Sequence, residues 1–247
     1  MKKSLYIFFL LLFSFQASFP QENQNHFLPG EKLKFVLFYG LINGGIVNVE
    51  LTSVVYEGKN AYQGKLLASS TGLADVIYKV RDEYQSIFDP ATILPYKAIR
   101  DISEGKYKRY DHAFYDNKNL KITNNKNKVF DVPLNIRDII AVFYYMRNIN
   151  YEKMKTGDLM KVNTFFDNEI YYLDVQYLGT ETINTKKGEF KCHKIAPFVE
   201  TGRAFENNDD MTIYLSADRN RVPVRVELNL KVGSIKCDLI EYSGLKY

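Results

Sequence analysis

The side chains that most often bind metals or attack substrates are scarce in this sequence. The 247-residue chain has His26, His112 and His193, and its cysteines are Cys192 and Cys237. His26 lies near the start, where we expect a flexible segment, and the other histidines stand far apart within alternating strand-like segments. Neither H-E-x-x-H nor C-x-x-C occurs. We therefore expect isolated strand histidines, no metal site and no cofactor.

Acidic residues offer two further candidates for chemistry. Asp209 and Asp210, near Glu206, have the hard oxygens that calcium prefers, but their spacing lacks the alternating ligands and central glycine of a calcium loop. This pattern favours a solvated loop.

The second acidic candidate is a mixed-charge segment. Asp101 and Glu104 lie beside the basic residues Lys106, Lys108 and Arg109. They could form a polar site, although charges that guard a strand edge against aggregation explain them equally well. With no nucleophile elbow, phosphate loop or dinucleotide fingerprint in the chain, we assign no catalytic residue, and the ligand-binding residues remain unknown.

The two cysteines leave an alternative open. Export would permit a Cys192–Cys237 disulfide if their strands were neighbours. Both residues also stand in register with apolar neighbours, as buried free cysteines do.

The first twenty residues have the pattern of a secretory leader. Lys2 and Lys3 precede an apolar run over residues 5–13, which is too short to span a bilayer. We predict a cleaved signal peptide at 1–20, a β-rich domain over 21–247, and a periplasmic protein without a membrane anchor. The formal net charge of +4 includes both leader lysines, so the chain without its leader carries +2. This charge is too small for a protein that binds the phosphate backbone of a nucleic acid.

Alternating polarity dominates the rest of the chain and predicts a mainly β fold. In 222–232 every even position is apolar, and 235–239 continues the pattern after Gly233. With 211–215, these segments predict a meander of three strands. Residues 33–39 and 47–51 alternate on either side of Asn43-Gly44-Gly45, which we interpret as a break between two strands. Further strands are predicted at 61–68, 83–88, 93–102, 106–115, 120–123, 128–132, 159–166, 170–178 and 189–195, and 72–80 is either a short helix or a strand.

Helical spacing appears in one substantial stretch. Ile136, Ile139, Ile140 and Phe143 recur with a period typical of a helix, which predicts a helix over 136–148 with Asn135 as its N-cap. Because residues 33–39 are apolar on both faces, their sheet needs two coverings, and the helix can supply one. We expect a curved antiparallel sheet or half-barrel with this principal helix packed on its concave face.

The chain resembles the exported bacterial family called domain of unknown function 3108 (DUF3108). The resemblance depends on Gly30-Glu31-Lys32-Leu33, on 138–147 (DIIAVFYYMR), on Gly188-Glu189-Phe190, and on the block 214–224 (YLSADRNRVPV). It implies an envelope location and a curved antiparallel architecture, with no established activity and no site residue to transfer.

Paired aromatic residues give the remaining functional hint. They occur at 144–145, 165–166 and 171–172. Because successive side chains of a strand point to opposite faces of the sheet, the two rings of each pair on a strand lie on opposite faces. Some rings could line a cavity for a lipid or another apolar envelope ligand, or the helix could simply plug the concave face. We expect a non-enzymatic binding or accessory module. The alternatives are an enzyme acting on an envelope polymer through carboxylates, and a structural or assembly partner with an exposed apolar patch.

Overall fold

The structure, a computed structural model, describes residues 25–40, 42–198, 210–230 and 233–247. The predicted leader, Glu206 and Asp209 lie outside these ranges. Over the described residues the chain forms one antiparallel sheet of 14 strands, so the predicted mainly β fold class is confirmed. The strands are β1 (Lys32–Tyr39), β2 (Ile42–Tyr56), β3 (Lys59–Ser70), β4 (Arg81–Phe88), β5 (Pro95–Glu104), β6 (Tyr107–Asp116), β7 (Lys121–Asn124), β8 (Val129–Asp131), β9 (Leu159–Phe166), β10 (Glu169–Thr185), β11 (Gly188–Pro197), β12 (Met211–Ser216), β13 (Pro223–Asn229) and β14 (Ser234–Ser243).

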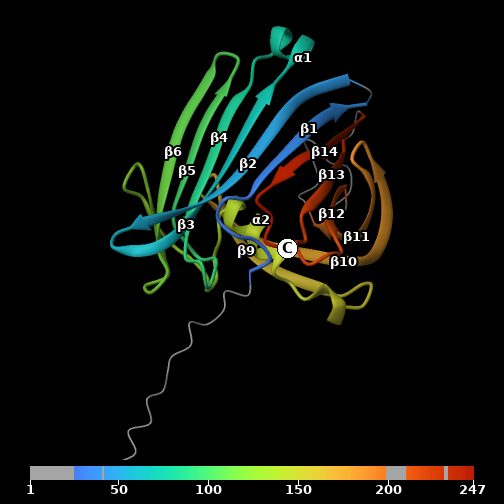
Figure 1. Ribbon diagram of the computed structural model, residues 1–247. Helices are drawn as coiled ribbons and strands as arrows, with labels where there is room; N and C mark the ends of the chain where they lie inside the picture. The colour runs from blue at the N-terminus through green and yellow to red at the C-terminus, as the bar shows by residue number, and fades with distance from the viewer. Residues whose placement is uncertain (1–24, 41, 199–209, 231–232) are drawn as a thin grey trace, which may run out of the picture.

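Two meanders make up this sheet. Strands β1 to β8 pair with their sequence neighbours, as do β9 to β14, and the meanders join where β1 pairs with β14. The connection from β8 to β9 contains helix α2 (Ile139–Arg147) and a short 3-10 helix (Tyr151–Lys153). Figure 1 shows the sheet curving around α2. The predicted meander of the last three strands and the helix between two runs of strands are both confirmed.

Helix α2 fills the concave face of the first meander. Ile140 and Tyr144 are buried in a cluster with Phe88 of β4 and Leu51 of β2. At Gly64 in β3, a Cβ atom would lie 2.7 Å from Ile140 Cγ2 and 2.8 Å from Tyr144 Cε2. The helix therefore lies so close to β3 that only glycine leaves room for it.

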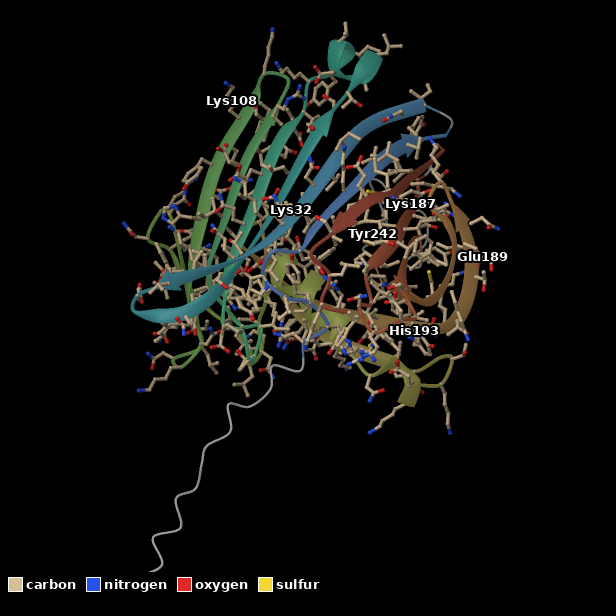
Figure 2. The ribbon with its side chains drawn as sticks, in the orientation of Figure 1. Lys32, Lys108, Lys187, Glu189, His193 and Tyr242 are labelled. Carbon is tan, nitrogen blue, oxygen red and sulfur yellow. The ribbon has the colours of Figure 1, made fainter. Side chains whose placement is uncertain are left out.

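The opposite face of β1 has its own covering. Phe35 joins the cluster around α2, whereas Phe38 lies under the Nζ of Lys186, 4.7 Å from the ring centroid. Lys187, the next residue in the turn between β10 and β11, lies over Tyr242 of β14, as Figure 2 shows. The second meander curls back over β1 and β14, and supplies the second covering that the sequence predicts.

The start of α2 differs from the prediction. Asp138, not Asn135, is the N-cap, and its carboxylate accepts hydrogen bonds from the backbone N–H groups of Ile140 and Ala141. Asn135 instead adopts a positive φ of 60° in the preceding turn. Arg137 then pairs with Thr164 in an isolated parallel bridge, which keeps the chain extended up to the cap.

The interpretation of Asn43-Gly44-Gly45 as a break between strands is wrong. These residues lie inside β2, opposite a register shift between Leu37 and Phe38 of β1. A Cβ at Gly45 would lie 2.7 Å from the Ser69 carbonyl oxygen of β3. Gly45 therefore allows a close strand approach beside the bulge in the sheet.

Two other local predictions are now resolved. The ambiguous segment 72–80 begins with a short helix, α1 (Gly72–Ile77). Strand β10 runs well past the predicted end at residue 178, because a register shift between Tyr177 and Gly179 lets the strand continue through the glycine.

A disulfide between Cys192 and Cys237 is excluded by topology. Cys192 is in β11 and Cys237 is in β14, with β12 and β13 between them. Strands about 4.8 Å apart place these residues roughly 14 Å from each other, too far for a bridge. Both cysteines are free, and burial raises the pKa of each thiol to about 12.

Candidate functional site

The two ends of the open sheet meet at a seam, where the β9 end faces strands β5 to β7. Among the described residues no strand ladder joins these ends. They contact each other through aromatic side chains instead. The Phe165 ring of β9 lies edge-on to Tyr115 of β6, with 6.3 Å between centroids, and to Phe130 of β8, at 5.1 Å.

A two-residue turn aims polar side chains across this seam. Asp167 and Asn168 connect β9 to β10, and both have positive φ values, 51° and 67°. Such values are typical of the tight hairpin turn that matches strand twist, and asparagine and aspartate tolerate them. Asn168 accepts a hydrogen bond from the Asn124 side chain of β7 at 2.8 Å.

Asp167 forms the stronger connection, which we call the Asp167 clasp. Its Oδ1 accepts from Arg100 of β5 at 2.8 Å and from Arg109 of β6 at 2.5 Å. Asp111 binds the same two guanidinium groups at 3.1 and 2.6 Å, which completes the clasp. Burial alone would raise the pKa of Asp167, but the two arginines outweigh it and hold that pKa below its ordinary value.

A cavity of about 70 Å³ lies under the clasp. Its walls come from both ends of the sheet and from the first turn of α2. The apolar part of the lining comprises Tyr84, Ala98, Ile99, Ala113, Ile139, Ile140, Phe165 and Phe166. The Arg100 guanidinium, also in the lining, lies 4.8 Å from the Phe166 ring centroid.

Polar groups also line this cavity. The Tyr115 hydroxyl is a buried atom without a hydrogen-bond partner among the described residues. The His112 Nδ1 also has none, but the His112 ring lies on the other face of β6, between Tyr110 and Phe114. Asp138 lies close to Tyr115 and raises the Tyr115 pKa, after the larger effect of burial. An apolar chamber with convergent polar groups has the general form of a small-molecule site.

Asp138 is the buried acid of the site. Burial raises its pKa to about 6, against the opposing effect of hydrogen bonds from Ser86 and from the helix N–H groups. Its carboxyl group therefore changes charge close to neutral pH. Because Ser86 Oγ at 2.6 Å and two amides already engage this carboxylate, it serves first as the helix cap.

The cavity volume limits what can bind. Pockets for drug-sized ligands occupy roughly 300–1,000 Å³, and an apolar cavity of roughly 150 Å³ takes up benzene. At about 70 Å³, the chamber admits a small terminal group and not a lipid chain. Of the two interpretations of the helix, the structure therefore favours the plug, with a small cavity left at the helix start.

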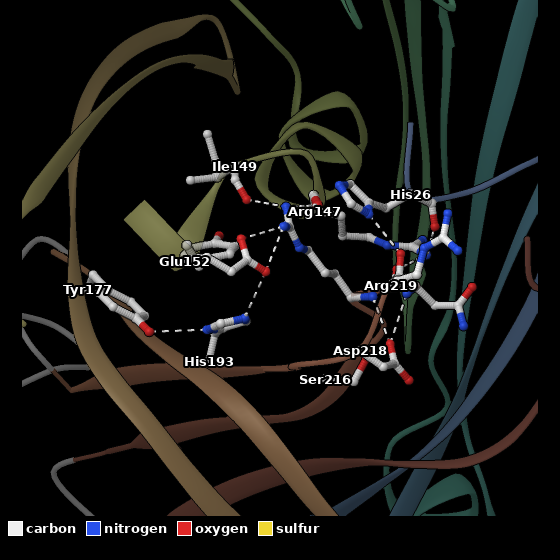
Figure 3. A network of polar contacts seen from close by, with 12 residues as sticks. His26, Arg147, Ile149, Glu152, Tyr177, His193, Ser216, Asp218 and Arg219 are labelled. Carbon is white, nitrogen blue, oxygen red and sulfur yellow. Dashed lines mark hydrogen bonds and ion pairs between the residues drawn. The ribbon is translucent and has the colours of Figure 1, made fainter. Parts of the chain in front are cut away.

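A second polar cluster surrounds the end of α2 (Figure 3). Arg221, just before β13, donates to both carboxylate oxygens of Glu152, at 3.0 and 2.7 Å, and to the Ile149 carbonyl oxygen. His193 accepts from or donates to the Tyr177 hydroxyl at 3.1 Å and stacks on Tyr151. Burial lowers the pKa of His193, with Glu152 opposing that shift, so the ring is neutral at neutral pH.

The contacts of this second cluster indicate a structural role. An open hollow of about 370 Å³ lies beside His193, but its lining acid, Glu152, is engaged by Arg221. Asp218 caps the turn before β13 by accepting from the N–H groups of Asn220 and Arg221. The block 214–224 thus holds the helix end against the sheet.

The candidates from the sequence are dispersed by the fold. Arg109 comes to the seam, the His112 side chain lies on the other face of β6, and His193 belongs to the second cluster. The expected flexibility around His26 is wrong, because its Nδ1 contacts the Arg219 carbonyl oxygen at 2.7 Å and its N–H donates to Asn148. Asp210 is buried and its carbonyl accepts from Asn229, so it is not part of a solvated loop.

The remaining candidates do not form one site. Glu104 lies near Asp82, and burial followed by that carboxylate raises the Glu104 pKa. Lys106 and Lys108 are exposed at the β5–β6 turn. Of the aromatic pairs, Tyr144 is core, Phe165 and Phe166 line the cavity, and Tyr172 is 70% exposed.

Sequence patterns do not single out Tyr115 or Asp167. Asp167-Asn168 between two apolar segments is a hairpin signal that identifies a turn. Its partners across the seam are far away in sequence, and no local pattern indicates them.

Within the described ranges, no group of three histidine, cysteine or acidic residues is placed to hold a metal ion. None of the helices in the same ranges has the length and apolarity needed to cross a bilayer.

Comparison with known proteins agrees with the architecture. Residues 34–240 match the family model described as "Protein of unknown function (DUF3108)". The chain belongs to the DUF3108 family. No curated protein matches its sequence.

Two solved structures are similar to this DUF3108 protein at low sequence identity. A β-barrel-like protein of the DUF1849 family from Brucella abortus has a TM-score of 0.58 and 10% identity, covering 87% of this chain and 98% of its own. A Bacteroides fragilis protein described as a "putative exported protein with YmcC-like fold" has a TM-score of 0.40 and 12% identity, covering 89% and 99%. The first likeness supports the curved, barrel-like sheet.

Proposed function

We propose that this DUF3108 protein is a non-enzymatic binding module of the periplasm that holds a small apolar group of an envelope component in the seam cavity. The observation that carries the proposal is the chamber under the Asp167 clasp, where Phe165 and Phe166 line the wall beside the buried, unpartnered Tyr115 hydroxyl. The leader that the sequence predicts at residues 1–20 supports export. A group with an apolar body and one uncharged hydrogen-bonding end fits this lining.

The acids at the cavity support binding over hydrolysis. Glycoside hydrolysis needs two carboxyl groups free to act on one bond. Asp138 is engaged as the helix cap, and Asp111 and Asp167 are both engaged by arginines. The cavity thus offers recognition without a free pair of catalytic acids.

Recovery of the bound molecule tests this proposal. We expect native mass spectrometry of protein purified from the periplasm to show an added small mass that organic extraction removes. Ala98→Leu adds three carbon atoms to the cavity wall and should abolish the added mass. Ala91→Leu, at an exposed turn position, should retain it. Protein recovered without any added mass, or an added mass that Ala98→Leu does not change, would contradict the proposal.

A further inference from the structure

One end of the first meander carries exposed apolar side chains that the seam cavity does not use. The β1–β2 turn, the α1 connection and the β5–β6 turn all lie at this end, at the top of Figure 1. We call the following residues the apolar rim: Ile42, Leu73, Val76, Ile77, Tyr78 and Tyr107. Their exposed fractions are 60%, 67%, 83%, 75%, 52% and 51%.

Hydrogen bonds between the three connections show that the rim is one surface. Thr71, the N-cap of α1, donates its N–H to the Gly44 carbonyl oxygen of β2. On the other side, Gly105 of the β5–β6 turn donates to the Lys79 carbonyl oxygen at 2.7 Å, and Tyr78 contacts the same turn. The three connections are therefore joined, and their apolar side chains project together.

Charge around the rim is positive. Lys79, Lys106 and Lys108 are exposed at this end, and Lys108 is labelled beside the β5–β6 turn in Figure 2. Of the neighbouring acids, Asp75 is paired with Arg81 at 2.6 Å. Glu104 lies beside Asp82, and burial followed by that carboxylate raises the Glu104 pKa.

We propose that the apolar rim docks this protein on the surface of an anionic lipid bilayer. Apolar side chains at the tips of separate turns can enter the boundary between headgroups and acyl chains, while the lysines reach lipid phosphates. The rim side chains stand on three separate connections at the ends of strands, so a fluid surface that needs no shaped complement fits them. This inference is independent of ligand binding at the seam.

Vesicle flotation of the full protein, purified after export, tests the docking. We expect binding to vesicles of phosphatidylethanolamine with phosphatidylglycerol, and weaker binding to pure phosphatidylcholine. Val76→Glu should reduce binding by at least about tenfold, because it replaces an inserting side chain with a negative charge. The matched control is Val55→Glu at the opposite end of β2, where valine is 73% exposed, and it should bind like the wild type.

A charge variant tests whether the lysines contribute to binding. Lys106→Glu/Lys108→Glu should weaken binding to the anionic vesicles and reduce its dependence on salt, with little effect on phosphatidylcholine. Unchanged thermal unfolding confirms that each variant is folded. Failure of the wild type to bind anionic vesicles, or equal loss in Val76→Glu and Val55→Glu, would overturn the proposal. Sedimentation that shows rim-dependent self-association without vesicle binding would assign the rim to a protein interface and also overturn it.

Discussion

Arg147, in the last turn of α2, donates to both carboxylate oxygens of Glu31, at 2.6 and 2.7 Å, across 116 residues of sequence. The side chains are 0% and 1% exposed. Arg147 also donates to the Asn220 carbonyl oxygen at 2.9 Å. Arg147 thus ties the helix to the segment before β1 of the first meander and to the turn before β13 of the second.

Removing one member of this pair should destabilise the fold strongly. Glu31→Gln leaves the Arg147 charge buried without its carboxylate, which costs about 3–5 kcal/mol. Replacing both residues, as in Glu31→Leu with Arg147→Met, should cost less than the sum of the single changes. Urea denaturation measures both effects. A Glu31→Gln loss below about 1 kcal/mol would mean that the pair is not buried as described.

Gly64→Ala should destabilise the protein by about 1–3 kcal/mol, because the new methyl group overlaps Ile140 and Tyr144 of α2. Gly44→Ala is the matched control. Its Cβ meets Leu37 at an ordinary 3.5 Å, so its unfolding free energy should change little. Equal urea midpoints for the two variants would show that α2 does not lie on β3.

These two positions show what the sequence can and cannot predict. Strand alternation and the helical period act within a few residues, so the meanders and the approximate position of α2 follow from the pattern at 222–232 and 136–148. The Glu31–Arg147 pair and the Asp167 clasp depend on how a long sheet curves, and partners so distant in sequence leave no local signal. The N-cap does not follow from the sequence, because Asn135 and Asp138 are both good capping residues and the bridge of Arg137 to β9 decides between them.

The stability of this protein should depend on pH through Asp138. Its pKa is raised from 3.8 to about 6 in the folded state. The folded protein therefore holds this proton more tightly than the unfolded chain, and the resulting stability is present below about pH 4 and is lost as the pH rises through 6. Asp138→Asn keeps a capping side chain but removes the titration.

Between pH 4 and pH 7 the unfolding free energy of the wild type should thus fall by roughly 2–3 kcal/mol relative to that of Asp138→Asn. Urea denaturation of both proteins across this range provides the measurement. A difference in unfolding free energy that stays constant with pH, or that grows in favour of the wild type, would contradict the raised pKa.

The cysteines should be inert in the folded protein. Burial raises both thiol pKa values to about 12, so little reactive thiolate is present at neutral pH. Alkylation should reach both thiols only after denaturation, and a reducing agent should leave the melting temperature unchanged. A melting temperature that falls on reduction would indicate a bridge and a different strand order.

Asp167→Asn should loosen the seam with little effect on global stability. The clasp is partly exposed, with 41% of the Asp167 side chain accessible, so its loss should cost about 1 kcal/mol or less. Hydrogen exchange should nevertheless become faster at the amides of β9 and its turn. Because arginine contacts hold the Asp167 pKa below its ordinary value, the same loosening should develop in the wild type as the pH falls below about 4. Exchange that is unchanged in Asp167→Asn would show that the clasp does not hold the seam.

The most direct test of the central claim, that the cavity under the Asp167 clasp receives a small apolar group, is an NMR titration at neutral pH with 1-butanol, butyramide and butyrate. The two uncharged probes should shift the amide signals of cavity residues such as Ala98, Ala113 and Ile139, and these shifts should vanish in Ala98→Leu. Butyrate should bind more weakly, because Asp138 is ionised above pH 6. Shifts that are absent at the seam, or that persist unchanged in Ala98→Leu, would contradict the claim.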